Sequence, residues 1–281
     1  MVTTLKLVED STLDEIRKQH FDLAVYASGY ERRASYLAKQ LEPAQIDRTL
    51  VLGFEQESDD PQRVENDRLF LERWTDTIVR ISSDDDGPIY DALRDFEWPS
   101  SKANILIDYS SMSRLWYAGI LNWVRHSTAS PTVNLWFSYA IPTYAKIVRP
   151  LSVINRILAI PGMEGRSMPF AQSVAIFGLG FDEYVTLAVL DRLEPDVVYS
   201  FFAGPGATPA YTSNAKRLNS ELIKFSNATV EIPLRSVRFA FTRIAEVVHL
   251  VIHTTKHPNH LWLMLVSPRR RDVDSHPLSL R

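Results

Sequence analysis

The sequence contains no cysteine, and this absence excludes several kinds of site at once. Disulfide frameworks, thiolate nucleophiles and cysteine-ligated zinc all require that side chain. The N-terminal residues Met1–Lys6 also lack the basic stretch and apolar run of a secretory signal. Both observations fit a reducing compartment, so we expect a cytoplasmic protein.

Long hydrophobic runs and an excess of positive charge are missing as well. The longest apolar stretch, Gly178–Leu190, is interrupted by Asp182 and Glu183, whereas a membrane span needs about 18 uninterrupted residues. The net charge is -3 at pH 7, and a dominant nucleic-acid-binding surface usually needs a strong basic excess. We therefore expect no membrane partner and no nucleic-acid partner.

The sequence contains an internal repeat. Residues 24–31 read AVYASGYE and residues 175–182 read AIFGLGFD, so an apolar run twice meets a Gly-aromatic-acid triplet. Leu-Glu-Pro follows each copy, at 41–43 and at 193–195. Such self-similarity indicates repeated structural units, and we interpret it as two related lobes.

Two asparagines extend the repeat, because Asn66 and Asn219 lie at nearly equal distances beyond the two Leu-Glu-Pro segments. Each one leads a stretch with helical spacing of its apolar residues. Their positions support the interpretation of a repeat but do not by themselves assign them a role.

Short apolar runs alternate with segments of helical spacing along most of the chain. In the first half we predict strands at 21–27, 49–54, 77–81, 104–107 and 133–139, with helices at 30–41, 64–74, 89–96 and 112–125. In the second half we predict strands at 173–179, 196–202, 228–232 and 260–266, with helices at 183–193, 212–226 and 236–249. This alternation predicts mostly parallel sheets flanked by helices.

The predicted fold class is therefore α/β, with two related lobes in a Rossmann-like pseudo-repeat. A chain of 281 residues suits about two domains. We place the first lobe at 1–145, a proline-containing connector at 146–172, and a second, smaller lobe at 173–281.

The turn after the first predicted strand is one candidate site. Gly29 lets the backbone approach a ligand at the carboxyl end of a strand, Glu31 can act as an acid or base, and Arg33 can hold a phosphate. The alternative is structural, because Ser28 and Glu31 have the spacing of a helix capping box. The two interpretations do not exclude each other.

The second candidate is the polar cluster after the strand at 104–107. Asp108 can accept hydrogen bonds from sugar hydroxyls or act as a base, Ser110 and Ser111 can bind phosphate, and Arg114 can neutralise it. The alternative is that Ser110 or Ser111 only caps the following helix.

Two further patterns favour a structural interpretation. The turn Gly204–Gly206 lacks the Lys and Ser of a phosphate-binding loop. His249 and His253 are four residues apart but lack the glutamate of a metalloprotease motif. We predict no metal site, and the sequence identifies no cofactor.

The Gly29–Arg33 turn and the Asp108–Arg114 element together resemble a pattern in uncharacterised two-lobed prokaryotic α/β proteins. In those proteins a Gly-Phe-Glu turn recurs in each lobe and an Asp-Ile-Ser-Ser-Met element lies between them. The resemblance implies a bacterial source and an accessory role in defence against phage. The second lobe has no Asp-x-Ser-Ser counterpart, its nearest equivalent being Val266–Arg269, so we expect the pocket mainly in the first lobe.

Two functional hypotheses follow. The first is a nucleotide- or phosphosugar-binding protein, a hydrolase or transferase in which Asp108 and Glu31 act as acid and base and Arg33 and Arg114 hold phosphate. The second is a non-catalytic adaptor or subunit of a prokaryotic complex, favoured by the missing phosphate loop and catalytic triad. The partner is accordingly a small phosphorylated ligand or another protein, and homo-oligomerisation stays open.

Overall fold

The structure is a computed structural model that describes residues 7–56, 59–129, 132–141, 159–162, 172–181, 183–206, 209–254 and 260–265. The chain divides into two compact units, for which we keep the names first and second lobe. Most of the predicted connector 146–172 lies outside the described residues, as does the Val266–Arg269 segment.

The first lobe is built on a five-stranded sheet in the order β3-β2-β1-β4-β5. Its strands are β1 (Leu23–Ser28), β2 (Thr49–Phe54), β3 (Val79–Ile81), β4 (Lys102–Asp108) and β5 (Thr132–Ser138). All neighbouring strands pair in parallel. The predicted α/β class with a parallel sheet is therefore confirmed, and the strand order reverses direction between β1 and β4.

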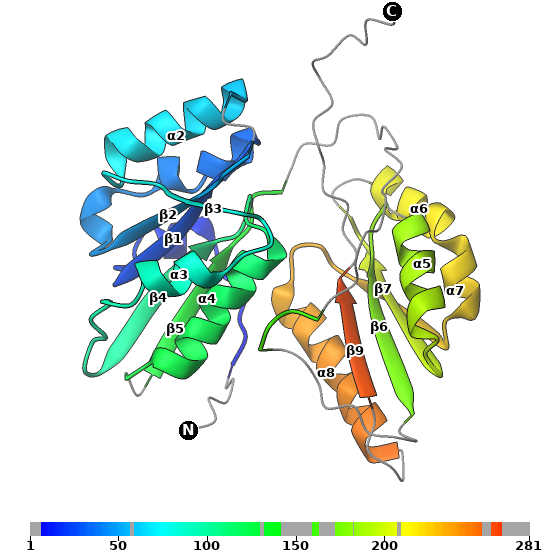
Figure 1. Cartoon of the computed structure of the whole chain (residues 1–281). Helices are drawn as coiled ribbons and strands as arrows, with labels where there is room; N and C mark the ends of the chain where they lie inside the picture. The colour runs from blue at the N-terminus through cyan, green and yellow to red at the C-terminus, as the bar shows by residue number, and fades with distance from the viewer. Residues whose placement is uncertain are drawn as a thin grey trace, which may run out of the picture. The chain divides into compact units, whose positions relative to one another are not determined.

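Helical segments cover both faces of this sheet (Figure 1). They are α1 (Leu13–Ile16), α2 (Pro61–Arg73), α3 (Gly87–Ala92), α4 (Arg114–Ser127) and the short 3-10 segments η1 (Arg32–Ser35), η2 (Ala38–Gln40) and η3 (Pro43–Gln45). Successive β1 residues point to opposite faces, so that Leu23 and Val25 join one core cluster while Ala24 and Tyr26 join the other.

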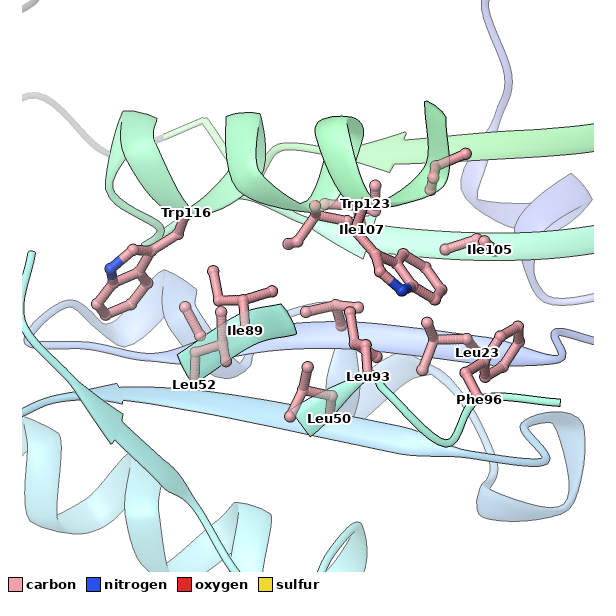
Figure 2. Packing of buried hydrophobic residues seen from close by; sticks show 14 of the residues in the cluster. Leu23, Leu50, Leu52, Ile89, Leu93, Phe96, Ile105, Ile107, Trp116 and Trp123 are labelled. Atoms are coloured by element: carbon pink, nitrogen blue, oxygen red, sulfur yellow. The ribbon is translucent and has the colours of Figure 1, made fainter. Parts of the chain in front are cut away.

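The larger core cluster lies between the sheet and helices α3 and α4. Trp116 and Trp123 extend from α4 into it, beside side chains of β2 and β4 (Figure 2). Fully buried aromatic side chains contribute large apolar areas to a core. The tryptophans of α4 are thus packing residues of the first lobe.

The predicted helix at 30–41 is wrong, because η1 and η2 replace it. Their backbone bonds run three residues apart, as in Ala34 N to Glu31 O and Gln40 N to Leu37 O. The capping-box alternative for Ser28 and Glu31 is also wrong. Ser28 is the last residue of β1 and its hydroxyl donates to Asp67 Oδ1 at 2.5 Å, so it is not available to cap a helix.

The second lobe repeats the first four positions of this topology. Its sheet has the order β8-β7-β6-β9, again with parallel pairing. The strands are β6 (Ser173–Leu179), β7 (Val197–Ala203), β8 (Ala228–Ile232) and β9 (His260–Leu265), and the helices are α5 (Glu183–Leu193), α6 (Pro209–Leu218), α7 (Ser220–Phe225) and α8 (Val237–Thr254). The predicted helix at 212–226 is divided at Asn219 into α6 and α7.

The matched asparagines make the same contact in each lobe. Asn66 Nδ2 donates to the carbonyl of Gly29 at 2.8 Å, and Asn219 Nδ2 donates to the carbonyl of Gly180 at 2.8 Å. Both glycines directly follow the first strand of their lobe. The two lobes therefore share a strand order and a buried side-chain contact.

The segment Leu7–Asp10 lies within the predicted first lobe, 1–145, but in the structure it belongs to the second lobe. Asp10 accepts hydrogen bonds from the backbone of Val237 at 2.7 Å and from the Ser236 hydroxyl at 2.7 Å. A carboxylate at this position satisfies amides at the start of α8. None of the described helices is both long and apolar enough to cross a membrane.

Shortening Ile105 to valine tests the first core cluster. Ile105 is fully buried in β4, and removal of one methylene at such a site should lower the free energy of unfolding by about 1 kcal/mol. Urea unfolding measures the change. Val64→Ala on α2 is the control, because Val64 is 52% exposed. An unchanged midpoint for Ile105→Val would contradict the packing described above.

Candidate functional site

The loops after β1 and β4 meet where the strand order of the first sheet reverses. Ligands of open parallel α/β sheets bind at this switch point, beyond the carboxyl ends of the strands. Gly29 directly follows β1, and a Cβ atom added to it would overlap Ser111 Oγ and lie 2.9 Å from Ser111 Cβ. The fold thus brings Gly29 against the Asp108–Ser111 segment that the sequence had singled out separately.

Asp108 is the last residue of β4 and is only 2% exposed. Its Oδ1 atom accepts hydrogen bonds from Ser110 Oγ at 2.5 Å and Ser110 N at 3.2 Å. Its Oδ2 atom is buried and accepts no hydrogen bond from any residue that the structure describes. Buried polar atoms without a partner are uncommon in folded proteins, so half of this carboxylate lacks the hydrogen bonds that burial requires.

Burial raises the pKa of the Asp108 carboxyl to about 6, against the opposing effects of the Ser110 hydrogen bonds and the Arg33 charge. The phenol of Tyr26 is also buried without a hydrogen-bond partner. Burial, followed by the charge of Asp108, raises the pKa of that phenol. A carboxyl that titrates close to neutral pH is suited to accept and return a proton.

Ser110 joins the ends of two strands. Its hydroxyl donates to Asp108 and accepts a hydrogen bond from the backbone N–H of Ala140 at 2.8 Å. Ala140 lies two residues beyond β5. The carboxylate is therefore held in one orientation by the neighbouring strand end.

Glu31 and Arg33 form an ion pair with each other. Arg33 Nε donates to Glu31 Oε2, Nη2 donates to Glu31 Oε1 at 3.3 Å, and Nη1 donates to Ala140 O at 3.0 Å. The guanidinium carbon lies 4.8 Å from the centre of the Tyr139 ring. Desolvation opposes the charge of Arg33, but the hydrogen bonds and charge of Glu31 outweigh it and raise the pKa of the guanidinium. Arg33 thus ties the Gly29 turn to the end of β5.

Aromatic residues directly follow both Gly29 and Asp108. Tyr30 stacks on Phe54 with ring centres 5.2 Å apart. Tyr109 stacks on Tyr139 with ring centres 5.1 Å apart. Burial, with smaller effects of neighbouring tyrosines and Asp108, raises the pKa of Tyr109 to about 12. The sequence shows these residue types, but not that they stack beside the switch point.

The start of α4 shows which serine caps the helix that follows Asp108. Ser113 is the N-cap residue, and its hydroxyl accepts from Trp116 N at 3.2 Å. The prediction that Ser110 or Ser111 caps this helix is therefore wrong. Arg114 is the first residue of α4 and is exposed.

Asn66 supports the Gly29 turn from beneath and is only 1% exposed. Besides its bond to Gly29, its Nδ2 atom donates to Glu31 O at 3.0 Å, and its Oδ1 atom accepts from Ser35 Oγ at 2.9 Å. In the sequence, Asn66 stands out only as part of the internal repeat. The matched spacing of Asn66 and Asn219 was the signal for a shared supporting role.

Within the described residues, no group of three or more His, Cys, Asp or Glu side chains is arranged to hold a metal ion. No protein-family model matches the chain, and no curated protein or solved structure matches it either.

Proposed function

We propose that the first lobe binds a small phosphorylated ligand, a nucleotide or a phosphosugar, at the carboxyl ends of β1 and β4. The observation that carries this proposal is Asp108 Oδ2, a buried carboxylate oxygen at the switch point that accepts no hydrogen bond within the described part of the chain. Leaving such an atom unsatisfied costs about 1–3 kcal/mol or more for a charged group. A sugar hydroxyl of a bound ligand would supply the missing donor.

The same carboxylate supports a reaction as well as binding. With its pKa raised to about 6 by burial, against the Ser110 hydrogen bonds and the Arg33 charge, Asp108 can take a proton from a ligand hydroxyl or from water and return it. This chemistry fits a hydrolase or a transferase. Glu31 is paired with Arg33, so Asp108 carries the acid and base role in this proposal.

The remaining predicted residues surround this group. Ser111 lies against Gly29, where a hydroxyl and the turn backbone can contact the ligand, and Arg114 is proposed to contact phosphate from the start of α4. The cytoplasmic location and the accessory role in defence rest on the sequence and its resemblance, and we carry them forward as part of the same proposal.

Binding of AMP and of glucose 6-phosphate to wild type and Asp108→Asn tests the proposal. Isothermal titration calorimetry should show that one of the two probes binds wild type and that the substitution weakens it at least tenfold. Loss of a hydrogen bond to a charged group is worth about 1.5–3 kcal/mol, which corresponds to this change.

Asp95→Asn is the matched control, because Asp95 is an exposed carboxylate in the same lobe. Equal affinities of wild type and Asp108→Asn would overturn the proposal. Native mass spectrometry of the purified protein gives a second readout, since a small phosphorylated molecule released on denaturation would support it. A chain that carries no small molecule would favour the adaptor hypothesis instead.

A further inference from the structure

A second polar cluster lies at the carboxyl ends of β1, β2 and β3. Asp67 of α2 accepts a hydrogen bond from Ser28 Oγ at 2.5 Å through Oδ1, and one from Arg80 Nη2 at 2.5 Å through Oδ2. Arg63 Nε stands 3.8 Å from the same Oδ2 atom. One carboxylate therefore faces two guanidinium groups.

Arg63 is buried in an unfavourable position. It is only 2% exposed and is the third residue of α2, where the helix dipole disfavours a cation. Its Nη1 atom donates to Gln56 O, yet its buried Nε atom has no hydrogen-bond acceptor among the residues that the structure describes. Asp67 offsets the charge of Arg63, but a buried donor without an acceptor still costs free energy. An anion at this position would supply the missing acceptor.

Arg80 is the accessible member of the cluster. It lies across Gly53 of β2, where an added Cβ atom would overlap Arg80 Nη1 and lie 2.8 Å from Ile78 Cγ2. The absent side chain of Gly53 therefore lets Arg80 reach Asp67 over the end of the sheet. The Arg80 side chain is 36% exposed, so it remains accessible to solvent.

We propose that Arg63 and Arg80 form a phosphate-binding subsite at the carboxyl ends of β2 and β3. Guanidinium groups bind phosphate through charge-assisted hydrogen bonds. The subsite adjoins the Asp108 site, because Ser28 contacts Asp67 while the next residue, Gly29, lies against Ser111.

This inference rests on the proposed function and extends it. One ligand would place its phosphate at Arg63 and Arg80, in place of the contact proposed above for Arg114, and its hydroxyl group at Asp108. Arg33, which the sequence suggested for the phosphate, is instead paired with Glu31 and donates to Ala140 O.

Binding of inorganic pyrophosphate to the full chain tests the subsite without requiring a sugar. Calorimetry at low ionic strength should show binding to wild type and a loss of at least tenfold in affinity for Arg80→Gln. Arg68→Gln is the matched control, because Arg68 lies on the same helix with its side chain 72% exposed, and it should bind as wild type. Arg80→Gln is the primary variant because removing the buried Arg63 also disturbs folding.

The outcomes of these measurements distinguish the two proposals. Pyrophosphate binding that needs Arg80 but is unchanged in Asp108→Asn supports the subsite, whether or not AMP and glucose 6-phosphate bind. If those sugar-bearing probes bind and Asp108→Asn weakens them, whereas Arg80→Gln leaves them and pyrophosphate unchanged, the subsite is wrong and the proposed function stands. Absence of pyrophosphate binding to wild type also overturns the subsite. AMP that competes with pyrophosphate identifies the subsite with the phosphate end of a nucleotide rather than with free phosphate.

Discussion

Asp108→Asn is expected to stabilise the protein by about 3 kcal/mol at about pH 8, although it weakens ligand binding. Burial raises the pKa of this carboxyl from 3.8 to about 6, and a pKa difference of that size between the folded and unfolded protein corresponds to about 3 kcal/mol. Asparagine keeps the shape and an oxygen that can accept from Ser110. It carries no charge, so it avoids the cost of burying an ionised group.

The stability difference between wild type and Asp108→Asn depends on pH, and its sign follows from the two protonation states. Between about pH 4 and about pH 6 the unfolded chain loses the Asp108 proton while the folded protein keeps it. The stability of wild type should therefore fall, relative to the variant, as the pH rises through this window. Above about pH 6 the full difference remains.

Urea unfolding of both proteins at several pH values measures this difference directly. Comparing the two proteins at each pH cancels the titration of the other groups. The exposed Asp95→Asn substitution should leave the pH profile of wild type unchanged. Parallel profiles for wild type and Asp108→Asn would show that Asp108 is not a desolvated carboxylate. Replacing a functional group is expected to give a variant that is more stable but binds its ligand more weakly.

Asn66→Ala should lower the free energy of unfolding by about 2–4 kcal/mol. The substitution leaves the Gly29 and Glu31 carbonyls and the Ser35 hydroxyl without their common partner. Each buried group left unsatisfied costs about 1–3 kcal/mol, and entering water recovers part of that loss. Asn66→Asp keeps the volume but removes the Nδ2 donor, so it should destabilise the protein nearly as much.

The second lobe offers a matched comparison. Asn219→Ala removes the bonds to Gly180 O and Ala215 O, and its Oδ1 atom has no hydrogen-bond partner to lose. We therefore expect a smaller loss, about 1 kcal/mol. Hydrogen exchange should report Asn66→Ala mainly in β1 and Asn219→Ala mainly in β6. Equal effects of both variants on both strands would contradict local support by each asparagine.

Local sequence patterns were enough to predict the fold class, because the spacing of apolar residues differs between strands and helices. Continuous apolar runs of strand length predicted the buried parallel strands, and the predicted strands 173–179 and 228–232 match β6 and β8 residue for residue. Helical spacing also located α5 at 183–193. Gly29 and Asp108 stood out because each is a polar or flexible residue at the end of such a run.

Tertiary structure alone decided the strand order and the state of each candidate residue. The apolar spacing of 30–41 suits a helix, but the buried bonds of Asn66 hold the turn before it and two 3-10 segments form instead. Ser28 meets a partner 39 residues away, and Arg33 meets one 107 residues away. Helix and strand periodicity reflects neighbours within a few residues, whereas the unsatisfied oxygen of Asp108 and the pairing of Arg33 depend on contacts between distant segments that no local pattern encodes.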